Sequence, residues 1–232
     1  MFSFTTRQIL WRVALAYLSF RVTNMQRIKK IESVNLAVLW GAMALLLVVG
    51  YGLHSGVYDM TRAIPFYLME FLTFVALAVL FWKPTGLTAL SSMVGAVFVL
   101  GSQLAMYYGI TDTTTAWVLA VIQIVLVGYT LYKQKGVVAT TSMQNYSVLA
   151  TGIMTLYGIW KVYALINWNW LSFNPESIMW DGAIAITGFA ALYQAASGGK
   201  GKAAVWIAAI GILIAIIAVF ASASPPLTVI GL

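Results

Sequence analysis

The chain has 232 residues, of which 62% are hydrophobic and only 8% are charged. Soluble domains carry about 25% charged residues, so this composition excludes a soluble globular protein and indicates an integral membrane protein. The absence of cysteine and the single histidine, His54, exclude disulfides, iron–sulfur clusters, thiolate metal sites and a bis-histidine haem within the chain. The net charge of +7 does not indicate a nucleic-acid partner, because the basic residues cluster at the ends of apolar segments.

Seven apolar segments are each long enough to cross about 30 Å of hydrocarbon as a helix. In chain order they are 34–54, 64–82, 87–108, 114–132, 146–167, 177–195 and 203–222. All five prolines lie at the edges of these segments or outside them, which predicts helices without proline kinks. The sequence therefore predicts an all-α, polytopic transmembrane bundle of seven or eight helices. We expect a single membrane domain over residues 1–232, with a short tail at 225–232.

The uncertain eighth span is the segment 4–22, which has Arg12 near its centre. An arginine in that position costs roughly 2.5–3.5 kcal/mol on insertion scales. The segment is therefore either a basic helix lying on the membrane surface or a spanning helix. Arg12 also interrupts the apolar core that a cleaved signal peptide would need.

Lysine and arginine are unequally divided between the two sides of the predicted bundle. One side receives nine of them, and the other receives Arg62, with Arg7 as well if the segment 4–22 spans. The nine are Arg21, Arg27, Lys29, Lys30, Lys83, Lys133, Lys135, Lys200 and Lys202. Because cytoplasmic loops carry the excess of basic residues, we expect a multi-pass protein of a cell membrane with these loops in the cytoplasm and the C-terminus outside.

The spacing of the apolar segments repeats when the sequence is shifted by 111 residues, the separation of Glu70 and Asp181. The segments of residues 1–110 then coincide with those of residues 111–224. The pattern predicts two parallel four-helix halves, related by an axis along the membrane normal. The repeat also favours the interpretation in which the segment 4–22 spans, because the span at 114–132 is then its counterpart.

Three ionisable side chains, Glu70, Lys161 and Asp181, fall inside the predicted spans, in their outer half. An unpaired charge is costly in hydrocarbon, so each should face the bundle interior and either meet a counter-charge or change its protonation. Lys161 and Asp181 lie at nearly the same depth on consecutive helices, and we expect them to form an ion pair.

The counter-charge expected for Glu70 depends on the first segment. If that segment spans, Arg12 is the natural partner. Otherwise the nearest basic residues are His54 and Arg62 at the outer loop.

The buried charges have three interpretations. They fix the register of neighbouring helices, they form an outward-facing polar vestibule that binds a solute or carries protons, or one or more of these side chains snorkels to the membrane interface. In the second case the substrate-binding or proton-linked residues are Glu70, Asp181, Lys161 and Arg12. The residues expected to line the vestibule are Tyr51, His54, Trp160 and Trp180. The two tryptophans also fit an aromatic belt at the membrane interface.

Several small residues lie at helical spacing within the predicted spans. Gly41 with Ala37 and Ala44, and Gly152 with Gly158, offer small faces for close helix contact.

The sequence shows no assembled nucleophile, metal site or phosphate site. We therefore expect neither enzyme activity nor a cofactor or metal.

The stretch IPFYLMEFLTFVALAVLFWKPTGLTALSSMVGAV resembles the second half of DoxX-like four-helix membrane proteins. The residues that carry this resemblance are Pro65, Glu70, Lys83 and Gly86, together with Arg12 in LWRVALAYLSFRV, which is similar to the arginine-bearing first helix of that family. The resemblance covers roughly residues 8–108, and the second half keeps only Asp181 and the spacing. It implies a membrane bundle that accompanies quinone-linked redox enzymes without holding their metal.

Two functions remain open. The first is a small-solute transporter or channel with a polar site at the buried charges, favoured by the recurrence of a carboxylate in each half. The second is a non-catalytic transmembrane subunit of a larger complex, which the DoxX-like resemblance would make a quinone-linked redox assembly. The expected partners are the lipid bilayer and either a small solute or other membrane subunits, in a homo- or hetero-oligomer, and no nucleic acid. A cavity that reaches the carboxylates would favour the first function.

Overall fold

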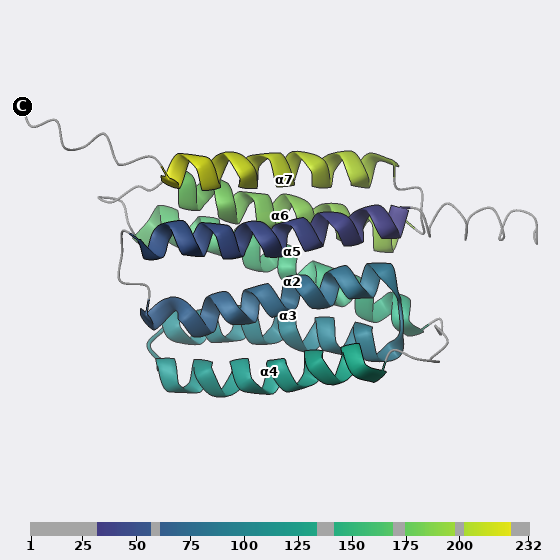
Figure 1. The fold of residues 1–232 in the computed structure, drawn as a ribbon, viewed down its shortest axis with the longest axis horizontal. Coiled ribbons are helices and arrows are strands. Elements are labelled where there is room, and N and C mark those ends of the chain that lie inside the picture. The colour runs from purple at the N-terminus through teal and green to yellow at the C-terminus, as the bar shows by residue number, and fades with distance from the viewer. Residues whose placement is uncertain (1–31, 57–60, 134–141, 169–174, 198–201, 224–232) are drawn as a thin grey trace, which may run out of the picture.

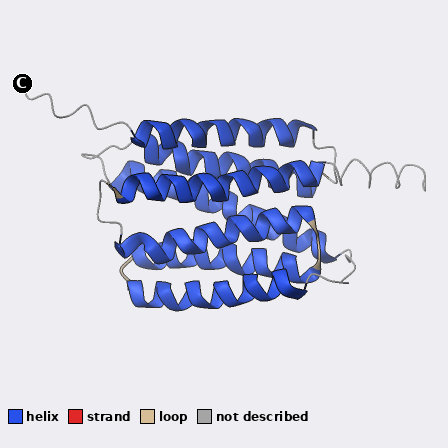
Figure 2. Ribbon diagram, in the orientation of Figure 1, coloured by secondary structure: helices blue, strands red, loops and turns tan. Residues whose placement is uncertain are grey.

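The computed structural model describes residues 32–56, 61–133, 142–168, 175–197 and 202–223. These residues form seven long helices that run side by side and alternate in direction (Figure 1). Apart from one short 3-10 helix, the rest of the described chain is turn or loop, and no strand occurs in it (Figure 2). The predicted all-α bundle is confirmed.

The helices follow the predicted segments closely. They are Glu32–Ser55, η1 (Thr61–Ala63), α2 (Ile64–Trp82), α3 (Gly86–Tyr107), α4 (Thr113–Lys133), α5 (Ser142–Trp168), α6 (Pro175–Ala196) and α7 (Lys202–Ala223). Each long helix begins and ends within two residues of its predicted bounds, except that α5 begins earlier. The segment 4–22, including Arg12, lies outside the described residues, so the eighth span and the internal repeat stay predictions.

Six of the described helices are long and apolar enough to cross a membrane, as a multi-pass membrane protein requires. The exception is α6, which is 22 residues long but carries Glu176, Asp181 and Gln194. It packs between α5 and α7, so two protein neighbours surround it. The polar residues Asp181 and Gln194 are buried, which shows that this helix turns them toward protein rather than toward lipid.

Two groups of helices meet across the Glu32–Ser55 helix. In one group α2, α3 and α4 pack against one another, and in the other α6 packs against both α5 and α7. Helix α3 also contacts α5 and so joins the groups. The Glu32–Ser55 helix contacts both, because the ring of Trp40 lies 5.4 Å from that of Phe74 in α2, and Glu32 accepts a hydrogen bond from Gln194 of α6.

Glycines mark the closest approach between α5 and α6. A Cβ atom at Gly158 would lie 2.5 Å from the backbone nitrogen of Ala185, and one at Gly188 would lie 3.0 Å from the backbone nitrogen of Thr155. By contrast, a Cβ at Gly41 would meet nothing within 4 Å, and one at Gly152 would only touch Leu192. The predicted close contact is therefore confirmed at Gly158 and absent at Gly41 and Gly152, although Ala37 and Ala44, predicted on the same face as Gly41, are buried.

At the end of the bundle that carries few basic residues, Asp112 caps α4. Its Oδ1 accepts hydrogen bonds from the backbone nitrogen and the hydroxyl of Thr115, both at 3.0 Å. These hydrogen bonds lower the pKa of the exposed Asp112 carboxyl. Because the folded-state pKa is lowered, the stabilisation from this cap is present above the ordinary aspartate pKa and is lost as the pH falls through the lowered value.

Replacing Gly158 by alanine should destabilise the bundle. The added Cβ would overlap the backbone of Ala185, which cannot move as a side chain can, and such overpacking costs about 1–3 kcal/mol. The expected result is a lower midpoint of thermal unfolding in detergent, followed by circular dichroism.

Gly128→Ala is the matched control for that substitution. Gly128 is exposed on α4, and a Cβ there meets nothing within 4 Å. Alanine favours a helix by about 1 kcal/mol over glycine, so this variant should keep or raise the midpoint. An equal loss of stability in both variants would contradict the close contact at Gly158.

Candidate functional site

A cavity of about 150 Å³ opens at the end of the bundle where the Glu32–Ser55 helix, α5 and α7 end and where α2 and α6 begin. Its polar and aromatic lining consists of Tyr51, His54, Tyr67, Lys161, Glu176, Ser177, Trp180 and Asp181. Apolar side chains such as Leu47, Leu165 and Val219 complete the wall. Because the lining comes from five helices, the cavity exists only in the assembled bundle.

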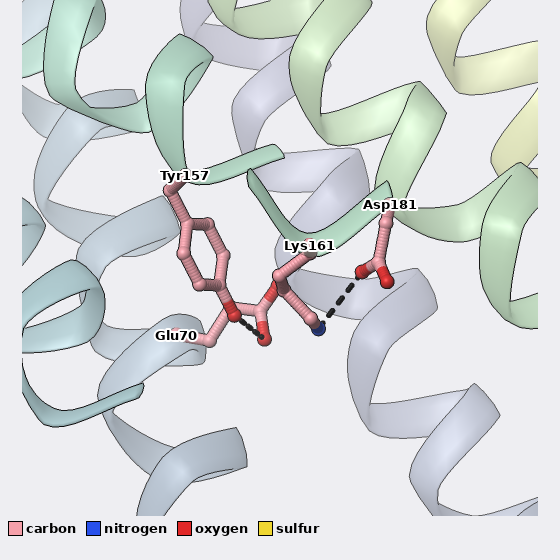
Figure 3. A network of polar contacts seen from close by, with 4 residues as sticks. All are labelled: Glu70, Tyr157, Lys161 and Asp181. Carbon is pink, nitrogen blue, oxygen red and sulfur yellow. Dashed lines mark hydrogen bonds and ion pairs between the residues drawn. The ribbon is translucent and has the colours of Figure 1, made fainter. Parts of the chain in front are cut away.

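The base of the cavity holds an ion pair between Lys161 and Asp181. The lysine Nζ lies 2.8 Å from Asp181 Oδ1 (Figure 3), and the structure therefore contains the expected pair. The Asp181 side chain is 3% exposed and the Lys161 side chain 23%. The lysine also lies over the ring of Tyr157, with Nζ 5.3 Å from its centre, a cation–π arrangement.

Glu70 lies behind this pair and does not line the cavity. It is 3% exposed, and its Oε2 accepts a hydrogen bond from the hydroxyl of Tyr157 at 3.1 Å (Figure 3). Its Oε1 is buried without a hydrogen-bond partner. The described partner of Glu70 is thus a tyrosine rather than the expected His54 or Arg62, and Arg12 lies outside the described residues.

Helix α5 carries both residues that connect the two carboxylates. Tyr157 and Lys161 are four residues apart, so they lie on the same face of the helix, one turn from each other. Tyr157 reaches Glu70 on α2, and Lys161 reaches Asp181 on α6. The close contact at Gly158, between these two residues in sequence, holds α5 against α6 one turn from Asp181.

The cluster has more negative than positive groups. Glu70 and Asp181 are carboxylates and Lys161 is the one cation hydrogen-bonded or ion-paired to either of them among the described residues. With all three ionised the cluster would hold one excess negative charge away from water. Burial penalises such a charge strongly, so the arrangement favours an additional proton or an additional cation. The chemistry available here is therefore cation binding or proton transfer.

Aromatic rings form much of the cavity wall. The rings of Tyr51 and Tyr67 meet edge to face with centres 5.2 Å apart, and Trp180 lies one residue before Asp181. Trp160 is not among the lining residues, because its ring packs 5.7 Å from that of Tyr107 on α3. Of the four residues expected to line a vestibule, the structure therefore brings Tyr51, His54 and Trp180 to the cavity and places Trp160 elsewhere.

Sequence reasoning missed Tyr157 and Tyr67. Both are tyrosines in apolar helices, where the usual interpretation is packing or an interfacial belt. A signal for Tyr157 was present, because it precedes Lys161 by one helical turn and so shares its face. Tyr67 precedes Glu70 by three residues, which is also close to one turn. No group of residues suited to holding a metal ion occurs in the described part of the chain.

Comparison with known protein families, with curated proteins and with solved structures finds no match for this chain. The DoxX-like resemblance consequently stays a prediction. The site has to be interpreted from its own geometry.

Lys161→Met should destabilise the protein strongly, because it leaves the Asp181 carboxylate buried without its cation. Breaking one side of a buried pair typically costs about 3–5 kcal/mol. The double variant Lys161→Met/Asp181→Asn removes both charges and should recover much of that loss. Thermal or denaturant unfolding in detergent measures both effects. Additive losses in the double variant would show that the two side chains do not interact.

Proposed function

We propose that the protein is a small-solute transporter or channel whose polar site is the cavity at Lys161 and Asp181. The observation that supports this proposal is the access from the cavity to that pair. An ion pair that served only to fix helix register would not need to be accessible from a cavity. Here Asp181 and Lys161 form part of the cavity wall, and the lysine keeps part of its side chain exposed.

The inner side of the site supports a carrier more than a continuously open pore. Behind the ion pair the space between the helices is filled by fully buried side chains, among them Trp40, Met69, Met154 and Tyr157. The cavity is therefore open toward one end of the described bundle and closed toward the other. A transporter alternates between a state in which its site is open to one side of the membrane and a state in which it is open to the other. A cavity open at one end and closed at the other is what the first of these states requires.

The charge distribution supports an outward-facing cavity. Among the described residues, Lys83, Lys133 and Lys202 lie at the opposite end of the bundle from the cavity (Figure 1). The positive-inside rule places that end in the cytoplasm. The cavity then faces the outside. Glu70 lies one turn deeper on α2 than Tyr67 of the cavity wall, and in this proposal it exchanges a proton when the site changes its access.

The alternative function is a non-catalytic subunit of a larger membrane complex. In that case the cavity would be filled by a partner, and the isolated protein would move no solute. The two functions differ in the behaviour of the purified protein alone.

Transport by the purified protein can be measured in proteoliposomes by stopped-flow light scattering with glycerol, urea and methylammonium chloride as probes. At least one probe should enter faster than into protein-free liposomes. Asp181→Asn and Glu70→Gln should reduce entry to the protein-free rate, because each removes a charge from the site.

Asp112→Asn is the matched control for the transport measurement. It removes a carboxylate at the same end of the bundle, outside the cavity, and asparagine still caps a helix. It should retain the wild-type rate. Entry of all three probes at the protein-free rate would favour the subunit function, and full activity in both site variants would reject the proposed site.

The proposed orientation can be tested with single cysteines, since the chain has none of its own. Ser55→Cys is exposed at the cavity end and Lys133→Cys is exposed at the other end. A membrane-impermeant maleimide should label Ser55→Cys in intact cells and Lys133→Cys only after the cells are permeabilised. The reverse pattern would place the cavity on the cytoplasmic side.

A further inference from the structure

The cavity wall combines two kinds of group that attract organic cations. Tyr51, Tyr67 and Trp180 supply aromatic rings, and Glu176 and Asp181 supply carboxylates. The face of an aromatic ring attracts a cation, most strongly where water is excluded, and a cage of such rings beside a carboxylate is a recognised arrangement for ammonium groups. The wall therefore suits an ammonium ligand better than an anion.

Two buried carboxyls, Asp181 in the cavity wall and Glu70 behind it, lie beside one lysine, Lys161, in the described part of the chain. That lysine is already engaged, since its Nζ contacts Asp181 at 2.8 Å and lies over the Tyr157 ring. The carboxyl of Glu70 lies directly behind, hydrogen-bonded to the same tyrosine. An entering cation would reduce the excess negative charge, whereas an entering anion would increase it.

The size and the remaining walls restrict the ligand further. A cavity of about 150 Å³ is of the volume that accommodates benzene in an engineered protein core. Leu47, Leu165, Ala218 and Val219 give it apolar surface that methyl groups can contact. A ligand of this size with one positive charge and apolar substituents matches both the volume and the wall.

We propose that the cavity binds a small monovalent organic cation, a protonated or methylated amine, with its charge between the Asp181 carboxylate and the rings of Tyr51, Tyr67 and Trp180. This inference deepens the proposed transport function by naming the class of its substrate. Binding can be measured without transport, so the two proposals can fail separately.

The sign of the electrostatic potential in the cavity can be determined at a cysteine introduced into its wall. Ser177→Cys on α6 and Leu165→Cys on α5 place a thiol in the lining from two different helices, and the second variant serves if the first fails to fold. Each is treated with a cationic methanethiosulfonate bearing a trimethylammonium group and with the anionic sulfonate analogue. Ser55→Cys, exposed at the same end of the bundle, gives the reference ratio of the two rates.

The ratio of cationic to anionic reaction rate should be about tenfold greater in the cavity than at Ser55→Cys, since an excess of negative charge in a low-dielectric cleft raises the local concentration of cations. Adding Asp181→Asn should bring the ratio down toward the reference, and adding Asp112→Asn should leave it unchanged. Tetramethylammonium chloride should slow modification of the cavity thiol by a neutral reagent, and sodium chloride at the same concentration should not. A ratio at or below the reference, or no protection by tetramethylammonium, would overturn the inference.

The outcomes separate this inference from the transport proposal. Cation preference and protection without solute entry into proteoliposomes would uphold the binding site and reject transport. Entry of glycerol or urea with no cation preference at the cavity thiol would uphold transport and reject the cationic substrate.

Discussion

The cost of an ionised side chain in hydrocarbon governs this structure more than any other interaction. Lys161 and Asp181 both lie within helices of a bundle that is otherwise strongly apolar, and each is the charged partner that the structure gives the other. Their pairing requires α5 and α6 to be close at one depth and in one rotation. The contact of Gly158 with the Ala185 backbone satisfies the first requirement, and the hydrogen bond from Tyr157 to Glu70 on α2 restrains the rotation of α5.

The two carboxylates that the predicted repeat would place in corresponding positions have different surroundings. Asp181 forms part of a cavity wall and has a cation as its partner, while Glu70 is sealed behind it and has a neutral hydroxyl. Asp181 is accessible from the cavity, whereas Glu70 is connected to the cavity wall through Tyr157 on α5 and through Tyr67 on its own helix, α2. The two carboxyls therefore differ both in their access to the cavity and in the charge of their partner.

Sequence reasoning recovered the positions of the helices because apolar length is a strong signal, and it recovered the Lys161–Asp181 pair because charges inside such segments are few. It did not recover which face of each helix points inward. Helices that are apolar all round show little periodicity in their sequence, so the sequence did not distinguish Gly158, which makes a close contact, from Gly41, which does not. For the same reason it did not distinguish Trp180, which lines the cavity, from Trp160, which packs on Tyr107. Tyr157 was missed because a tyrosine on α5 becomes the partner of Glu70 only once the folded bundle brings its hydroxyl within reach of α2.

The limited apolarity of α6 has a consequence for how the protein enters the membrane during synthesis. A helix that carries Asp181 is a poor candidate to leave the translocon on its own, since its carboxylate would meet lipid before meeting a partner. Helix α5, which is synthesised first, already holds Lys161. If the two helices partition together as an antiparallel hairpin, the carboxylate is neutralised before it leaves the aqueous channel. The same ion pair that borders the cavity in the finished protein would then act earlier as the means by which its least apolar helix is inserted.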